Sequence, residues 1–372
     1  MTIQNVSVFW ALSVFWLFAS CEAPEQVADV HKPTEVIAYY VGDGTDLEDY
    51  PVSDLSHIIY SFLHLRGNEL AFDNEESEQT FARLVALKKT YPELKVLLAL
   101  GGWSGCKTCS DVFSTKEARA TFASSFLELV RNHGADGLDL DWEYPAIEGF
   151  PGHPFKASDK PNFTELVRVL RTTVGDSIEI SFAAGGFSTY IDEAIDWAQV
   201  MPIVDRVNLM TYDLVGGYST MTGHHTPLFD SHHQPQAGHP AIQSLLSLGV
   251  PAEKIIMGSA FYGRVWENVD STNQGLYRSG KFKQGVDFKD LGKYLTDNPG
   301  YVEHWDDSTK ALHMYNPEQR LFLTLDDTRS VRLKTQYVLD HGLGGIMFWH
   351  LTADTPTGGL LDVITNTIDE AD

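Results

Sequence analysis

The chain has 372 residues and carries 51 acidic against 27 basic side chains, which gives a net charge of −24. This acidic balance disfavours a nucleic-acid partner, because few basic groups are available to neutralise phosphates. With 43 % hydrophobic and 21 % charged residues the composition is that of a globular protein, and the length suits one barrel-type domain or two smaller ones.

The first twenty residues are typical of a targeting signal. The run from Val6 to Ala19 is apolar apart from two serines, which is about the length of a signal-peptide core and short for a membrane-spanning helix. The residues ending at Cys21 (LFASC) resemble a bacterial lipobox, although no Lys or Arg precedes Val6 and Phe18 is bulky for such a motif. We predict a signal peptide over residues 1–20, acylation of Cys21 and a flexible, proline-containing tether over residues 21–34. The protein is then expected outside the cytoplasm, held at the membrane or cell surface only by lipid; ordinary secretion and a retained anchor are the alternatives.

Eight apolar segments follow the tether and alternate with segments of helical spacing. The predicted strands are Glu35–Tyr40, His57–Leu65, Leu94–Leu100, the acidic stretch Asp136–Pro145, Ile178–Ala183, Arg206–Tyr212, Lys254–Ala260 and Gly344–His350. Apolar residues recur at i, i+3 and i+4 in Lys116–His133, Asn162–Thr173, Ile191–Met201 and Thr328–His341. Apolar strands joined by helices predict a parallel sheet buried on both faces. Eight such units predict an α/β fold, a (β/α)8 TIM barrel over residues 35–368. The rival open sheet would need a glycine-rich phosphate turn after the first strand, and residues 41–44 (VGDG) match one poorly.

The connection between the seventh and eighth predicted strands is too long for a barrel unit. Between residues 264 and 324 it contains strand-like aromatic pieces at Gly275–Tyr277, Tyr301–Trp305, Leu312–Tyr315 and Leu321–Leu325. We predict a small α+β insertion over residues 265–324, which would form one wall of a groove at the catalytic face of the barrel. Trp266, Tyr277 and Trp305 would form either its core or a stacking wall.

Two clusters have the residue types of metal sites. Cys106 and Cys109 form a lone CxxC, and zinc would need two further ligands at matching spacing. A short-loop disulfide is the preferred interpretation outside the cytoplasm, because no thioredoxin-like context suggests a redox motif. The second cluster contains five histidines, His224, His225, His232, His233 and His239. Adjacent histidines in a loop converge poorly on a metal, so we predict loop packing or substrate contact there and no metal site.

The stretch from residue 136 to residue 145 (DGLDLDWEYP) is the most informative of the chain. In an extended strand Asp139, Asp141 and Glu143 project from one face, roughly 6.5–7 Å apart, and the apolar residues between them project from the other. Three carboxylates in a protected place are costly unless they share protons and hydrogen bonds. A solvated edge strand or a cation site is the alternative, but the apolar opposite face argues against an edge. We predict an active-site strand, with Asp136 in a structural role at its beginning.

The ends of the predicted strands collect further polar and aromatic side chains. In a barrel the active site lies at the carboxyl ends of the strands. Those ends are Gly101–Ser104, Asp141–Tyr144, Met210–Asp213, Phe261–Arg264 and Trp349–His350. Aromatic faces stack on the apolar faces of sugars, and a carboxylic acid can protonate an acetal oxygen. A single aromatic residue could be packing, but the agreement of five strand ends favours a carbohydrate-cleaving site.

These motifs resemble those of glycoside hydrolase family 18, the chitinases, and are most similar to the bacterial type with an α+β insertion. The acidic stretch fits the family pattern DxxDxDxE, and LALGGW, MTYD, FYGR and GGIMFWHL fit its other blocks, from about Val36 to Ile364. Ala99 departs from the pattern, since the family has a serine there. The resemblance implies hydrolysis of β-1,4 linkages between N-acetylglucosamine units in chitin and chitooligosaccharides, without a cofactor.

The resemblance also implies roles for individual residues. Glu143 would be the general acid, and the 2-acetamido oxygen of the substrate would attack the anomeric carbon, giving an oxazolinium ion and retention. Asp141 would hold the acetamido N–H, Asp139 would share a proton with Asp141, and Tyr212 would hold the acetamido oxygen. Asp213 would contact the sugar at the cleavage site and Trp349 would lie under the distorted ring. The remaining substrate-binding residues would be Gly101, Gly102, Trp103, Tyr144, Met210, Arg264 and Tyr40.

Two other functions share the fold and the motif. One is an endo-β-N-acetylglucosaminidase that acts on N-glycan cores, and the other is a chitin-binding lectin without activity. Such lectins typically lack the last acid of the motif, whereas Glu143 is present here. The insertion, MTYD and FYGR favour the chitinase. We expect a monomer whose partner is the chitin or chitooligosaccharide substrate.

Overall fold

The computed structural model describes residues 1, 2 and 33–371. The predicted signal peptide from residue 3 onward, Cys21 and the tether up to residue 32 lie outside the described residues. Among the helices of the described range, none is both long and apolar enough to cross a membrane.

Eight parallel strands close into a barrel, as predicted. They are β1 (Glu35–Tyr40), β2 (His57–Arg66), β4 (Lys95–Gly101), β5 (Gly137–Asp141), β6 (Glu179–Gly185), β7 (Arg206–Met210), β8 (Ile255–Ala260) and β14 (Gly345–Trp349). Their order is β1-β14-β8-β7-β6-β5-β4-β2, and pairing of β1 with β2 closes the circle. A short strand β3 (Glu69–Ala71), which was not predicted, pairs antiparallel with the end of β2. The predicted TIM barrel is confirmed.

Alternate residues of each barrel strand face the barrel interior or the surrounding helices. On β1, Ile37 and Tyr39 belong to the interior cluster, together with Ala99 of β4, whereas Ala38 and Tyr40 belong to the layer under the helices. This alternation decides which residue of each pair can reach the barrel mouth.

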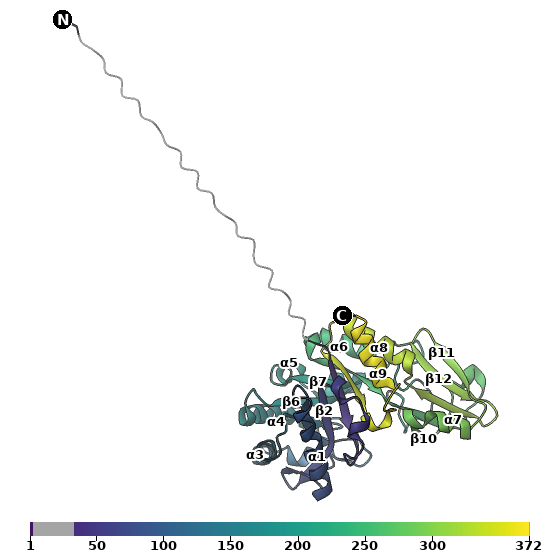
Figure 1. Cartoon of the computed structure of the whole chain (residues 1–372), viewed down its shortest axis with the longest axis horizontal. Coiled ribbons are helices and arrows are strands. Elements are labelled where there is room, and N and C mark those ends of the chain that lie inside the picture. The colour runs from purple at the N-terminus through teal and green to yellow at the C-terminus, as the bar shows by residue number, and fades with distance from the viewer. Residues whose placement is uncertain (3–32, 372) are drawn as a thin grey trace. The chain divides into compact units, whose positions relative to one another are not determined.

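Helices cover the outside of the barrel (Figure 1). The main ones are α1 (Glu75–Ala86), α3 (Lys116–His133), α4 (Asp159–Val174), α6 (Gly238–Ser247), α8 (Thr328–Asp340) and α9 (Leu360–Asp369). The predicted continuous helix over Ile191–Met201 is wrong: a π-helical turn (Tyr190–Ala194) and α5 (Trp197–Val200) are separated by extended Ile195. Asp196 begins the second piece, because its side chain accepts a hydrogen bond from the backbone N–H of Gln199.

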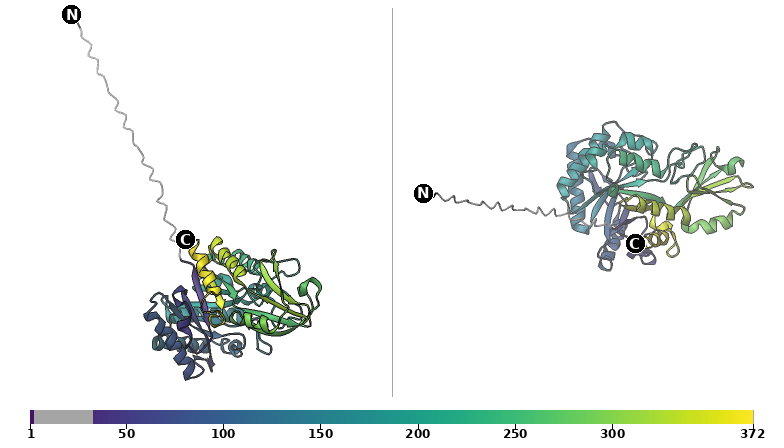
Figure 2. Two further views of the ribbon diagram at one scale, coloured as in Figure 1. Left: turned by 45° about the vertical axis from the view of Figure 1, so that its right-hand side comes forward. Right: turned by 90° about the horizontal axis from the view of Figure 1, so that it is seen from above.

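The long connection before the last strand contains an antiparallel sheet of five strands, which all views show beside the barrel (Figures 1 and 2). Its strands are β9 (Tyr262–Glu267), β10 (Lys281–Asp287), β11 (Val302–Asp306), β12 (Ala311–Asn316) and β13 (Leu321–Leu325), with α7 (Leu291–Asp297) packed against them. The strand expected over Gly275–Tyr277 is wrong, because that segment follows a 3-10 turn and Tyr277 has φ 58°. The outermost strand β10 was missed because most of its residues are polar and exposed. Trp266 and Tyr277 belong to the packing of this sheet, and Trp305 packs against its core.

An ion-pair network fills the amino end of the barrel. Arg206, which is buried, pairs with Glu35 at 2.9 Å and with Glu179 at 2.6 Å. His57 and Lys95 also pair with Glu179. The carboxylates at this end therefore have cationic partners.

Candidate active site

A cavity of about 1090 Å³ opens at the carboxyl ends of the strands. Eleven of the predicted site residues line it: Gly101, Gly102, Trp103, Asp141, Glu143, Tyr144, Met210, Tyr212, Asp213, Arg264 and Trp349. The strands bring these residues together from positions more than 200 residues apart in the sequence, as the barrel topology predicts.

Tyr40 was assigned to the cavity, and the structure places Tyr39 there instead. Tyr40 is buried on the helix side of β1, where its hydroxyl donates to Asp46 at 2.8 Å and accepts from the backbone N–H of Gly44. Because neighbouring strand residues face opposite sides, Tyr39 shares the interior face of β1 with Ile37, and Tyr40 faces the helices.

Asp139 lies directly under the cavity and is fully buried. Its carboxylate accepts three hydrogen bonds, from Tyr39 at 2.8 Å, from Ser181 at 2.6 Å and from Asn208 at 2.9 Å. Burial raises the pKa of Asp139, and the hydrogen bonds from Ser181 and Tyr39 act in the opposite direction. Ser181 follows from the register, since it lies opposite Asp139 on the neighbouring strand β6. Because β4 has Ala99 opposite Asp139, β6 and β7 supply donors in its place.

The sharing of a proton between Asp139 and Asp141 stays a prediction. The side chain of Asp141 interacts with Glu143, the next acid along the chain. Burial raises the pKa of Asp141 well above its ordinary value, and the charges of Glu143 and Asp139 raise it further. The two outer acids therefore both act on Asp141, but its direct partner is Glu143.

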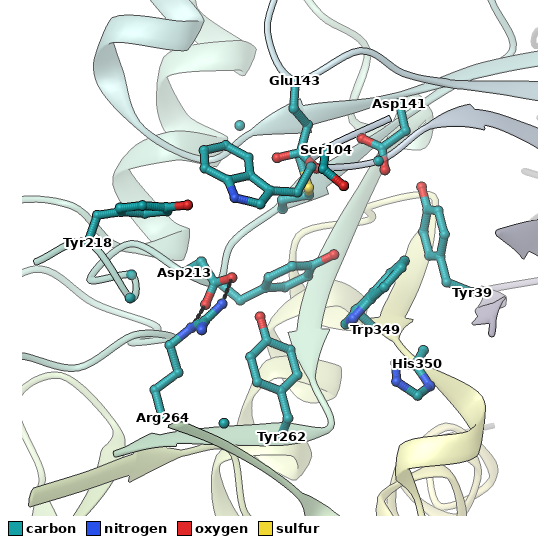
Figure 3. A pocket seen from close by; sticks show the side chains of 18 of the residues that line it. Tyr39, Ser104, Asp141, Glu143, Asp213, Tyr218, Tyr262, Arg264, Trp349 and His350 are labelled. Atoms are coloured by element: carbon teal, nitrogen blue, oxygen red, sulfur yellow. Dashed lines mark hydrogen bonds and ion pairs between the residues drawn. The ribbon is translucent and has the colours of Figure 1, made fainter. Parts of the chain in front are cut away.

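Glu143 has a pKa suited to donating a proton near neutrality. Burial raises the pKa of Glu143 to about 7; the charge of Asp213 also raises it, and hydrogen bonds with Tyr144 and Asp141 oppose the shift. Figure 3 shows Glu143 and Asp141 together on one wall of the cavity, with Trp349 and Tyr262 facing them. A carboxylic acid that is partly protonated at pH 7 can act as a general acid.

The pKa of Asp213 is shifted in the opposite direction from that of Glu143. It lies at φ 54° directly after Tyr212, and the guanidinium of Arg264 forms two hydrogen bonds with its carboxylate. Burial would raise the pKa of Asp213, but the Arg264 and His225 side chains hold it well below its ordinary range. Asp213 is thus a charged, positioned carboxylate.

Two glycines let β4 approach the acidic strand. Gly101 and Gly102 have φ angles of 109° and 77°, which strongly favour glycine. A Cβ on Gly101 would lie 2.3 Å from the carbonyl oxygen of Asp141, and one on Gly102 would lie 2.4 Å from the ring of Phe62. These residues therefore shape the cavity through the space that they leave.

Aromatic rings form two separate groups in the cavity. Trp349 packs against Tyr39 and Phe62, with ring centres 5.7 and 5.5 Å apart. Trp103 instead contacts Tyr144 at 6.2 Å and Tyr218 at 5.9 Å. Phe62, Tyr218 and Tyr262 also line the cavity but were not predicted as substrate-binding residues. Phe62 lies within the predicted strand His57–Leu65, Tyr218 follows the MTYD motif, and Tyr262 lies within FYGR.

The two metal-like clusters have other roles in the structure. Cys106 and Cys109 form a disulfide, as predicted. His224 and His225 are fully buried; His224 lies 3.3 Å from Asp306 and His225 lies 3.5 Å from Asp213. His233 packs against the ring of Tyr277, and His239 contacts Tyr337. Within residues 33–371, no group of three or more His, Cys, Asp or Glu side chains is arranged to hold a metal ion.

The model of the glycosyl hydrolases family 18 matches residues 35–354 of the chain. The chain belongs to glycoside hydrolase family 18. Chitinase A1 of Niallia circulans is 34 % identical over 321 residues, which cover 77 % of this chain and 46 % of that protein. Chitinase B of Serratia marcescens is 29 % identical, over 91 % of this chain and 83 % of that protein. The chain thus spans less than half the length of one family 18 relative and most of the other.

Solved structures of family 18 share the fold. Chitinase ChiA74 from Bacillus thuringiensis has a TM-score of 0.84 at 25 % identity, and covers 91 % of this chain and 70 % of its own. A family 18 N-acetylglucosaminidase from Paenibacillus barengoltzii has a TM-score of 0.80 at 33 % identity, and covers 90 % of this chain and 99 % of its own. The protein is therefore a glycoside hydrolase, and its relatives in family 18 differ in the substrates that their names state.

Proposed function

We propose that the protein hydrolyses β-1,4 linkages between N-acetylglucosamine units in chitin and chitooligosaccharides, with retention and with the substrate as the nucleophile. The observation that carries this proposal is the contrast among the cavity carboxyls. Burial raises the pKa of Glu143 to about 7, whereas the carboxylate of Asp213 is held by Arg264. The names of the relatives, chitinase A1 and chitinase B, support the substrate class.

A protein nucleophile would require an ionised carboxylate on the face of the sugar opposite the acid. In retaining enzymes of that kind the two carboxyl groups lie about 5–5.5 Å apart on opposite sides of the bond. Asp141 lies beside Glu143 on the same wall, and burial raises its pKa, which disfavours the ionised form. Asp213 is already paired with a guanidinium. The acetamido group of the substrate is then the available nucleophile.

The proposed reaction proceeds in two steps. Glu143 donates its proton to the glycosidic oxygen while the acetamido carbonyl oxygen attacks the anomeric carbon, so the bond to the leaving group breaks and an oxazolinium ion forms. Asp141 accepts a hydrogen bond from the acetamido N–H, which orients the acetamido oxygen towards the anomeric carbon. Water then attacks the anomeric carbon from the face that the leaving group has left, and Glu143 takes its proton. The product keeps the β configuration.

The other residues hold the ring in place. Tyr212 lines the cavity and would donate its hydroxyl to the acetamido oxygen, and Trp349 would lie under the distorted ring. Tyr39 and Ser181 fix Asp139, whose charge acts on Asp141. This arrangement would position the nucleophile before the bond breaks.

Incubation with chitotetraose and, separately, with a high-mannose glycoprotein tests the substrate class. Release of chitobiose or N-acetylglucosamine from chitotetraose alone supports the proposal. Glycan release alone would establish the endo-β-N-acetylglucosaminidase, and binding without turnover would establish the lectin. The N-acetylglucosaminidase among the similar structures makes the ratio of monomer to dimer product worth measuring in the same assay.

We also propose that the protein is lipid-anchored outside the cytoplasm through Cys21. The apolar run before Cys21 and the polar tether after it support this proposal. Cys21→Ala should move the protein from the membrane fraction to the soluble fraction of the producing cell. Unchanged fractionation would refute acylation.

A further inference from the structure

The disulfide between Cys106 and Cys109 is not used by the proposed reaction. The two cysteines are only three positions apart, and both are buried. The stabilisation that a disulfide gives by restricting the unfolded chain grows with the logarithm of the loop length, so a loop this short gains little from that source. A local role for the bond is therefore of interest.

The bond closes the turn that carries Trp103. The turn leaves the barrel at Gly101, where a Cβ would lie 3.1 Å from the sulfur of Cys106. Gly102 donates its N–H to the carbonyl of Asp141 at 3.0 Å, and Gly105 donates to Gly102 at 2.9 Å. The sulfur of Cys106 is thus packed under the first residues of the turn, directly beside the acidic strand.

The other cysteine is anchored in the protein core. Cys109 is fully buried and begins α2 (Cys109–Val112). The next residue, Ser110, donates to the buried carboxylate of Asp159 at 2.9 Å. Phe113, which follows, packs on Trp142 with ring centres 5.5 Å apart. The disulfide therefore joins the turn to an element that is fixed in the core.

Trp103 is the large side chain that this turn presents to the cavity. Its ring is 37 % exposed and contacts Tyr144, Phe150 and Tyr218, which belong to neighbouring loops. Trp349, which would lie under the ring being cleaved, belongs to the other aromatic group. If the cleaved ring lies over Trp349, the separate group around Trp103 would meet sugars farther along the chain, on the leaving-group side of the bond.

We propose that the Cys106–Cys109 disulfide is a positioning element for Trp103, and that it raises the affinity of the cavity for the leaving-group sugars of a β-1,4-linked N-acetylglucosamine chain. This inference rests on the proposed function for the identity of the ligand. An aromatic platform binds a sugar well only when its ring is held at a fixed angle, because ordering a free loop on binding costs entropy. The bond removes that cost before the ligand arrives.

A double-mutant cycle in the Glu143→Gln background tests the proposal by binding alone. The dissociation constant of chitotetraose is measured by calorimetry for the background, for Cys106→Ala/Cys109→Ala, for Trp103→Ala and for the three changes together. We expect loss of the disulfide to weaken binding by about five- to tenfold when Trp103 is present, and by less than about twofold when it is absent. Loss of the disulfide that weakens binding equally in both backgrounds, or in neither, overturns the proposal.

Two controls separate positioning from stability. Val331→Ala creates a cavity in α8, at a fully buried position outside the cavity lining, and should lower the thermal midpoint without changing the dissociation constant. If the alanine pair does not fold, Cys106→Ala/Cys109→Val refills the buried position, and reduction of the Glu143→Gln protein by a phosphine gives the same comparison. Turnover of chitotetraose by the protein with Glu143 intact is measured alongside. A failure of the proposed function then appears as absent turnover, whereas a failure of this inference appears as unchanged or uncoupled affinity.

Discussion

Glu179 at the amino end of the barrel and Glu143 at its carboxyl end are both buried, and their pKa values are shifted in opposite directions. At the amino end, burial would raise the pKa of Glu179, but the hydrogen bond from His57 and the charge of Arg206 outweigh it and hold that pKa well below the ordinary range. At the carboxyl end, burial raises the pKa of Glu143 to about 7, and its nearest neighbours are another acid and a tyrosine. Both carboxyl groups are buried, so their neighbouring side chains decide whether each one is ionised.

The difference also sets opposite dependences of stability on pH. The pKa of Glu179 is lowered in the folded state, so its contribution to stability is present above its unfolded pKa and is lost as the pH falls. The pKa of Glu143 is raised, so its contribution is present below its unfolded pKa and is lost as the pH rises through about 7. At neutral pH, Glu179 at the amino end therefore stabilises the fold. The raised pKa of Glu143 lowers the stability of the fold at the same pH, but it leaves an acid that can donate a proton.

The largest effect should come from removing the acid at the mouth. Glu143→Gln should lower kcat for chitotetraose by about a thousandfold or more, since the leaving oxygen then lacks its proton donor. Glu148→Gln is the matched control, because Glu148 lines the same cavity but is exposed, and its kcat should stay within about threefold. Initial rates and calorimetric binding, measured together, distinguish lost chemistry from lost binding. More than a few per cent of activity in Glu143→Gln would contradict the assignment.

At the amino end the main expected effect is on stability and not on turnover. Arg206→Met removes the guanidinium shared by Glu35 and Glu179 and should lower the free energy of unfolding by about 3–5 kcal/mol. Arg168→Met breaks an exposed pair with Glu165 and should cost less than about 1 kcal/mol. Urea unfolding measures both, and kcat of the folded fraction should fall only slightly, because the charge of Arg206 reaches the site only through the pKa of Asp139. A fall in kcat with unchanged stability would remove the contrast between the two ends.

The dependence of kcat/KM on pH should report the protonation of Glu143 directly. Because Glu143 must be protonated to donate, kcat/KM for chitotetraose should fall as the pH rises through about 7, approaching about tenfold per pH unit above it. A substrate with a good leaving group, such as an aryl β-chitobioside carrying two nitro groups, needs less protonation and should show a flatter alkaline limb. Equal slopes for the two substrates would place the titration elsewhere.

The smallest effect concerns the hydrogen bonds under the mouth. Ser181→Ala removes one of three donors to Asp139 and should lower kcat about three- to tenfold with little change in KM, because Asp139 acts through Asp141. The conservative variant Ser181→Thr keeps the hydroxyl and should recover most of the rate. An equal loss in both variants would indicate a packing role for Ser181.

The sequence predicts the barrel well because the buried strands are continuous apolar runs. Alternation along β5 places Asp141 at the mouth, and Glu143 also lines the cavity although the strand ends two residues before it. The sequence does not decide between Tyr39 and Tyr40, since both are aromatic and only the position of β1 in the closed barrel distinguishes interior from exterior. The partners of Asp139 depend on the register of β5 with β6, and the partner of Asp141 on the path of the chain after the strand. Edge strand β10 was missed because its exposed residues lack an apolar pattern.

The nucleophile is the central claim, and one series of substrates tests it most directly. Aryl β-chitobiosides in which the acetyl group next to the cleaved bond is replaced by fluoroacetyl, difluoroacetyl and trifluoroacetyl have progressively weaker carbonyl nucleophiles. If the acetamido oxygen attacks, kcat/KM should fall steeply along the series, while hydrolysis of all members remains dependent on the mouth residues. A rate that is independent of fluorination would show that a group of the protein, or water, attacks the anomeric carbon, and would contradict the account.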